Sequence, residues 1–65
     1  MLIPNVIKRK EGYIGIVTCI DDISKRTIWK QDTAIYRLTP ADAKEDAIIE
    51  VEYLKRRAGH DNDNS

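Results

Sequence analysis

The sequence predicts an α+β fold, a small three-stranded antiparallel β-meander packed against one C-terminal α-helix. Three features predict it. A helical period with its own start and stop signals covers residues 39–59, and a β-branched and aromatic run covers 13–20. Two shorter strand-like segments, 27–31 and 34–38, lie between them. Residues 13–59 are therefore expected to form one β-β-β-α domain.

The C-terminal helix is predicted from its ends. Thr39 is suited to cap the first turn together with Asp42, and Pro40 fits the first helical position, where no N–H is needed. Acidic residues gather near its start and basic residues near its end, as the helix dipole favours. Gly59 predicts a left-handed stop.

One face of this helix is apolar and rich in small residues. At about 100° per residue, a stripe forms from Ala43, Ala47, Val51, Leu54 and Ala58. The alanines predict a close approach to the layer beneath. A lone helix of this length is marginal in water, so the stripe must be buried against residues 1–38.

Residues 13–20 are the clearest predicted strand, and their alternation defines two faces. One face holds Ile14, Ile16, Thr18 and Ile20, and the other holds Tyr13, Gly15, Val17 and Cys19. The isoleucine face is the expected seat of the helix. In mid-strand, Gly15 predicts either a bulge or a close approach of another backbone.

The remaining segments are assigned from turn signals and composition. Residues 21–26 are expected to connect two strands, and Asp32-Thr33 to form a second turn. Because Pro4 interrupts an apolar run, residues 1–12 are predicted to be an N-terminal arm or an edge strand. The polar residues 60–65 are expected to form a disordered tail.

Composition limits the functional classes. The chain has 65 residues, 11 basic and 11 acidic side chains, and a single cysteine, Cys19, which excludes an intramolecular disulfide framework. The lone His60 and Cys19 form no catalytic or metal-binding constellation, so the prediction is a non-enzyme without cofactor or metal. No signal peptide or membrane span is recognisable, which favours a cytoplasmic protein without a membrane partner.

The function expected first is protein–protein interaction, as a small inhibitor, adaptor or regulator of the kind that phages and mobile elements encode. One sheet face should stay uncovered, carrying Tyr13, Val17 and Cys19 with either Ile28 or Trp29. The partner is an unidentified protein or a second copy of the chain. The predicted contact residues are Tyr13, Trp29, Ile49, Tyr53, Arg56 and Arg57.

The alternative is nucleic-acid binding through the sheet and its basic loops. Residues 1–30 contain six Lys or Arg against three Asp or Glu, whereas residues 31–65 contain five against eight. The predicted contacts are Lys8, Arg9, Lys10, Lys25, Arg26 and Lys30. The expected element order over 13–57 resembles the arm-type DNA-binding domain of tyrosine recombinases, which implies a sheet that enters the major groove. Zero net charge departs from that role.

Overall fold

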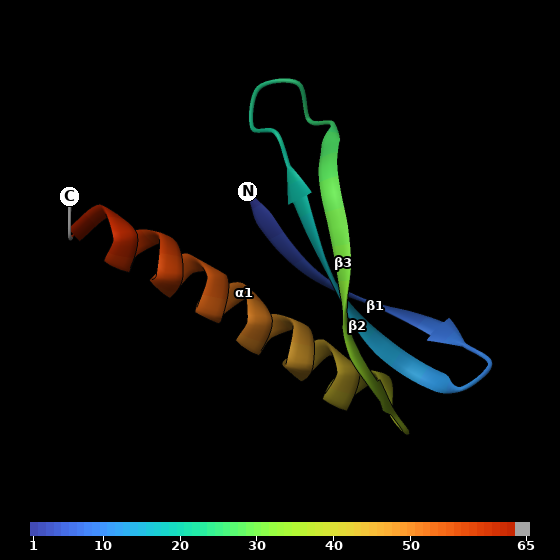
Figure 1. The fold of residues 1–65 in the computed structure, drawn as a ribbon. Helices are drawn as coiled ribbons and strands as arrows, with labels where there is room; N and C mark the ends of the chain where they lie inside the picture. Colours follow the sequence, from blue (N-terminus) through green and yellow to red (C-terminus); the bar gives the residue numbers. More distant parts are fainter. Residues whose placement is uncertain (64–65) are drawn as a thin grey trace.

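The fold is one open three-stranded sheet followed by a long helix (Figure 1). A computed structural model describes residues 1–63, with side chains up to Ala58. The elements are β1 (Leu2–Arg9), β2 (Gly12–Ile20), β3 (Thr27–Arg37) and α1 (Pro40–Asp63). Both strand pairs are antiparallel, in the order β1-β2-β3. The predicted α+β class is confirmed.

The N-terminal segment is an edge strand. β1 pairs with β2 along its whole length, from Leu2↔Cys19 to Arg9↔Gly12. Met1 and Ile20 exchange two backbone hydrogen bonds of 2.8 and 2.9 Å. Hydrogen-bonded and non-hydrogen-bonded pairs alternate along antiparallel strands, so Pro4 belongs to a non-hydrogen-bonded pair and its nitrogen points away from β2. Proline is tolerated there because an outward-facing backbone nitrogen needs no partner in the sheet.

β3 is one continuous strand, so the turn predicted at Asp32-Thr33 is wrong. Ile14 pairs with Tyr36 and Ile16 pairs with Asp32, so a step of two residues along β2 corresponds to a step of four residues along β3. The extra length forms a bulge in which Ala34 has a φ of 63° and its N–H donates a 3.0 Å hydrogen bond to Asp32 Oδ1. The short polar side chain therefore stabilises an irregularity within the strand instead of a reversal of the chain.

The start of α1 is as predicted and its end is not. The N–H of Asp42 donates a 3.3 Å hydrogen bond to Thr39 Oγ1, which confirms the N-cap. The helix continues to Asp63, past the stop predicted at Gly59, and residues 60–63 of the expected tail are helical. Glycine costs about 1 kcal/mol relative to alanine within a helix, but it does not force the helix to end. Residues 64–65 lie outside the described part.

The helix covers the face of β2 opposite to the one predicted. Val17, Ala43 and Ala47 have 0 % exposure, and a Cβ placed on Gly15 would lie 2.5 Å from the carbonyl oxygen of Ala43 and 3.1 Å from the Cβ of Ala47. Because Gly15 has no side chain, Ala43 and Ala47 of the helix stripe can pack directly against β2. An isoleucine surface would hold the helix backbone further from the strand.

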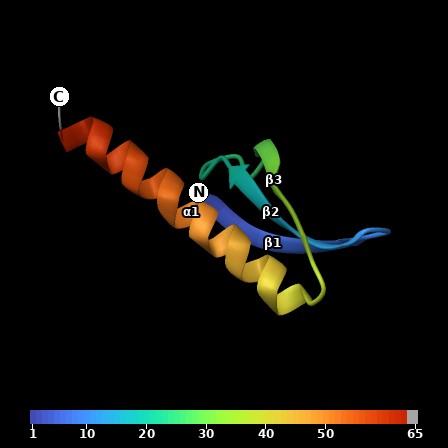
Figure 2. The same ribbon diagram turned by 60° about the horizontal axis from the view of Figure 1, so that its bottom comes forward.

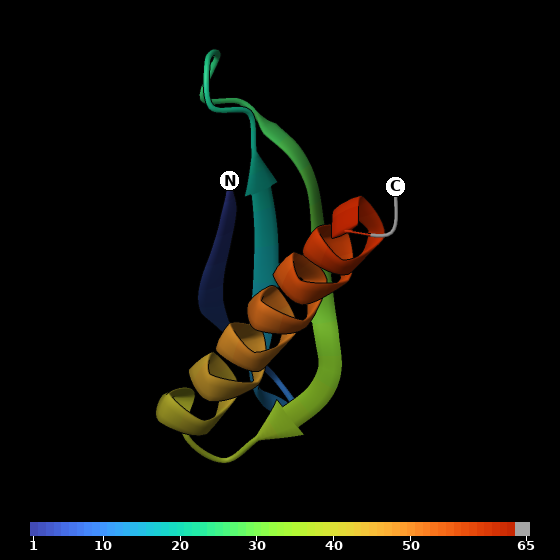
Figure 3. The same cartoon turned by 90° about the vertical axis from the view of Figure 1, so that its left-hand side faces the viewer.

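Only the first half of the helix stripe is buried. Val51 completes the core, whereas Leu54 is half-buried and Ala58 is exposed. α1 has 24 residues, about 36 Å of helix, and its last turns extend beyond the sheet (Figures 1 and 2). Figure 3 shows the helix crossing the strands obliquely on one face.

Candidate protein-interaction surface

The sheet face opposite α1 is lined with isoleucine and is covered by no described element (Figure 2). Cross-strand partners share a face, so the pairs Ile7↔Ile14 and Ile3↔Thr18 place residues of β1 and β2 side by side. The isoleucines on this open face are Ile3, Ile7, Ile14, Ile16 and Ile20. Ile14 is buried, whereas Ile7 is 37 % exposed. Within residues 1–58, the open isoleucine face is thus an apolar surface that no helix or strand covers.

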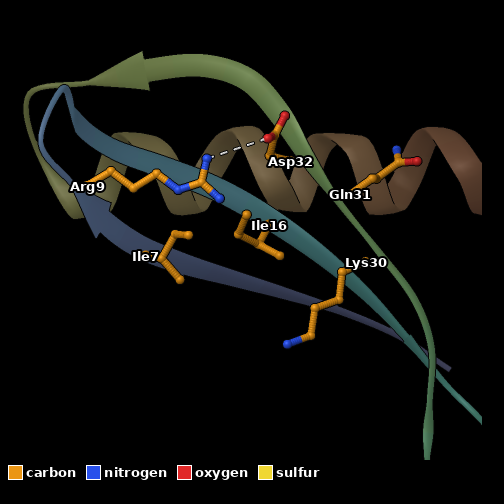
Figure 4. A pocket seen from close by; sticks show the side chains of 6 residues that line it. All are labelled: Ile7, Arg9, Ile16, Lys30, Gln31 and Asp32. Carbon is orange, nitrogen blue, oxygen red and sulfur yellow. Dashed lines mark ion pairs between the residues drawn. The ribbon is translucent and has the colours of Figure 1, made fainter.

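A shallow hollow of about 620 Å³ lies on the open isoleucine face (Figure 4). Ile7 and Ile16 form its apolar floor, while Arg9, Lys30 and Asp32 stand around it. Gln31 also lines it. An apolar floor with a charged margin is the usual composition of a protein-binding patch.

Arg9 crosses the sheet from β1 to β3 and closes one end of this hollow. Its Nη1 lies 3.8 Å from Asp32 Oδ2 and donates a 3.4 Å hydrogen bond to the Tyr36 hydroxyl. The hydrogen bond to Tyr36 raises the pKa of Arg9, which therefore stays charged. The Lys30 ammonium takes part in none of the ion pairs found within residues 1–58 and is available to a partner.

The aromatic residues predicted for the uncovered face lie elsewhere. Tyr13 and Trp29 share the face of Val17 and Cys19, which is the helix side, and Trp29 pairs directly with Cys19. The expectation that Tyr13, Val17 and Cys19 line the open face is therefore wrong. The Lys8 ammonium lies 5.9 Å from the centroid of the Tyr13 ring, a cation–π contact.

The other predicted contact residues lie on the helix. Ile49 and Tyr53 are 57 % and 54 % exposed, and Arg56 and Arg57 are exposed on the following turn. These four side chains form a surface separate from the open isoleucine face. Their role in binding stays a prediction.

Two side-chain contacts join β3 to α1. Arg37 donates from Nε to Asp46 Oδ2 at 2.7 Å and from Nη2 to Asp46 Oδ1 at 3.1 Å, and this hydrogen bonding lowers the pKa of Asp46. Gln31 Nε2 donates a 3.3 Å hydrogen bond to Glu50 Oε1. Ile49 lies beside the first contact, in a hollow shared with Arg37 and Asp46.

The basic residues predicted to bind nucleic acid are divided between the two ends of the sheet. Lys8, Arg9 and Lys10 lie at the β1–β2 end, whereas Lys25 and Arg26 lie in the β2–β3 connection (Figure 1). The nine residues of β2 between these ends span about 30 Å. Lys30 stands between the two groups on β3, and no continuous basic stripe results within the described residues.

The candidate surface that the sequence reasoning missed is the open isoleucine face. Its signal is the alternation of isoleucine through both β1 and β2, which was interpreted as the seat of the helix. Within the described residues, no three His, Cys, Asp or Glu side chains are grouped to hold a metal ion. No helix in that same part is long and apolar enough to cross a membrane.

Comparisons of the chain with protein-family models, curated proteins and solved structures found no match. The resemblance in element order to the recombinase arm-type domain therefore stays a prediction. Any functional hypothesis depends on the geometry of this chain alone.

Proposed function

We propose that this chain is a small non-enzymatic protein–protein interaction module, acting as an inhibitor, adaptor or regulator, and that it binds its partner through the open isoleucine face. One observation carries the proposal: the helix covers the Gly15 and Val17 face, which leaves an isoleucine-lined sheet surface that no described helix or strand covers. Large contiguous apolar patches are uncommon on monomeric proteins and mark interaction sites.

The chemistry of this surface indicates the kind of partner. Ile7 and Ile16 offer a stiff, branched apolar floor, which suits a partner with an apolar surface of its own. Lys30 at the margin favours an acidic group beside that apolar surface. The charged margin contributes specificity and orientation more than affinity.

The test compares two isoleucine substitutions of the same chemistry. Ile7→Glu places a charge on the open isoleucine face, on an edge strand and at a partly exposed position, so the fold is expected to persist. Ile23→Glu is the matched control, because Ile23 is 93 % exposed in the β2–β3 connection, outside that face. Tagged wild-type protein and both variants are used to capture partners from a bacterial lysate, with and without nuclease, and read by mass spectrometry.

We expect a discrete protein that survives nuclease, is retained by Ile23→Glu and is lost with Ile7→Glu by at least about tenfold in recovery. Circular dichroism and thermal unfolding of each variant establish that the fold is intact. Equal recovery by the two folded variants would contradict the choice of surface.

Nucleic-acid binding stays the alternative, and the division of the basic side chains gives it less support. Phosphate contacts are strongest at low salt, so binding by this route should be measurable at about 50 mM salt and fall steeply above it. Absence of binding at that concentration removes the alternative. The cytoplasmic location and the phage or mobile-element origin expected from the sequence stay predictions as well.

A further inference from the structure

The far half of α1 is a helix without a supporting layer. Burial against the sheet ends near Leu54, which is half-buried, and residues 55–58 are exposed. The backbone nevertheless remains helical to Asp63, and these turns extend away from the strands (Figures 1 and 2). Most helical stability in proteins comes from packing of an apolar face, so a second surface against this half would stabilise it.

The side of α1 turned away from its buried stripe carries an apolar pair between opposite charges. Ile49 and Tyr53 are one turn apart and are both more than half exposed. Glu45 lies one turn before this pair and Arg56 about one turn after it. The apolar centre is thus bounded by an acidic group on one side and a basic group on the other.

The helical period places these charges in matching positions. Eleven residues make about three full turns, so Glu45 and Arg56 lie on one flank of the apolar pair. By the same period, Asp46 and Arg57 lie on the other flank. Each flank therefore begins acidic and ends basic along the helix direction.

We propose that α1 pairs antiparallel with α1 of a second copy of this chain, around a two-fold axis level with Val51. In this arrangement Ile49 meets Tyr53 of the partner subunit, and Glu45 meets Arg56 of the partner subunit. The same symmetry brings Asp46 opposite Arg57 of the partner subunit. A two-fold interface requires a self-complementary surface, and this row of side chains meets that condition.

The two flanks are not equivalent. Asp46 already accepts two hydrogen bonds from Arg37, so it can accept fewer hydrogen bonds from a second arginine. Glu45 and Arg56 take part in none of the ion pairs found within residues 1–58. The flank of Glu45 and Arg56 therefore determines the specificity, and antiparallel helix dipoles add a favourable contribution.

This surface is independent of the open isoleucine face, which lies on the opposite side of the sheet from α1 (Figure 2). Dimerisation through α1 leaves that face available to another protein. The dimer and the proposed function can therefore fail separately.

The test is a charge exchange read by sedimentation velocity over a range of protein concentrations. Glu45→Arg sets two guanidinium groups against each other at both ends of the symmetric interface, and Arg56→Glu creates the corresponding acidic clash. The wild type is expected to dimerise, and each single variant to raise the dimer dissociation constant by at least about tenfold. Mixing the two variants removes the like-charge clashes that each has alone, so a heterodimer should form.

Two further variants separate this interface from other surfaces. Tyr53→Asp should abolish the dimer, whereas Ile7→Glu should leave it intact, and circular dichroism confirms that each variant is folded. A monomeric wild type at all concentrations overturns the proposal. A dimer indifferent to the charge exchange, or single variants that stay monomeric when mixed, overturns it as well.

Discussion

In the middle of β2 the two faces of the sheet differ in side-chain size, and there the helix covers the smaller side chains. On the covered face, Gly15 and Val17 meet Ala43 and Ala47. On the open face, isoleucines line β1 and β2 with no described layer above them. The helix therefore packs on the face where its backbone can approach β2 closely, and the total apolar area of a face does not decide its position.

Close approach explains this choice. The carbonyl oxygen of Ala43 lies where a side chain on Gly15 would begin, so helix and strand make contact nearly backbone to backbone. Dense packing of small groups gains many dispersion contacts at short range. The buried apolar core consists of Ile14, Val17, Ala43, Ala47 and Val51. Apart from Ile14, the isoleucines of the open face stay at least partly exposed.

The change with the largest expected effect is Gly15→Val, which breaks the fit on the covered face. The new side chain would collide with the backbone of Ala43 and with Ala47, so the helix must move away from β2. We expect the free energy of unfolding to fall by about 3 kcal/mol or more, a large part of the stability of a chain of this size. Urea denaturation followed by circular dichroism measures it.

Ile16→Val is the matched control for this change, because Ile16 is the next residue on the same strand and lies on the open face. It should lower the free energy of unfolding by less than about 1 kcal/mol. Similar losses in the two variants would contradict the assignment of the faces.

A smaller effect is expected from substitutions that remove carbon atoms from a face of the sheet and introduce no steric clash. Val17→Ala removes buried carbon atoms beneath the helix and should cost about 2 kcal/mol, from lost burial and the cavity left behind. Ile7→Val removes one methylene from a half-exposed position and should cost less than about 0.5 kcal/mol. Thermal or urea unfolding of both proteins checks the order, and a reversed order would mean that the open face is the real core.

The smallest effect concerns the ion pair that fastens β3 to α1. The hydrogen bond from Arg37 lowers the pKa of Asp46 in the folded chain below its unfolded value of about 3.9. A carboxyl with a lowered folded pKa contributes its full stability above the unfolded pKa, and this contribution is lost as the pH falls through the folded pKa. The difference in free energy of unfolding between the wild type and Asp46→Asn should therefore be constant near neutral pH and shrink below about pH 4.

Urea titrations at several pH values measure this difference. Glu52→Gln is the control, since Glu52 is exposed on the same helix and takes part in none of the ion pairs found within the described side chains. A difference for Asp46→Asn that persists unchanged to about pH 2 would exclude the ion pair as its source.

Much of the fold was predictable because it depends on short-range chemistry. The Thr39 cap, the first position of Pro40 and the alanine stripe as far as Val51 all follow from residues within a few positions of each other, and the structure has them as predicted. The strand at 13–20 was predictable for the same reason. Local signals failed where a neighbouring strand altered the outcome: Asp32-Thr33 forms a bulge because β2 holds β3 on both sides of it.

The candidate site was less predictable than the fold. Ile49 and Tyr53 were recognised from the sequence as an exposed pair, because helical periodicity separates them from the buried stripe. Ile7 and Ile16 were not recognised, because an isoleucine on a strand is consistent with either a core or an open face. Tyr13 was placed on the wrong face for that same reason, and the choice between Ile28 and Trp29 stayed open.

By itself, the sequence determined the strand at residues 13–20, the C-terminal helix with its start, and the residues that share each face of β2, since all of these follow from spacing along the chain. The tertiary structure alone decided which face of β2 is covered. Alternation divides a strand into two sets of side chains, but both sets here are apolar, and only the close approach of α1 at Gly15 distinguishes them. That contact joins residues nearly thirty positions apart, beyond the reach of any local pattern.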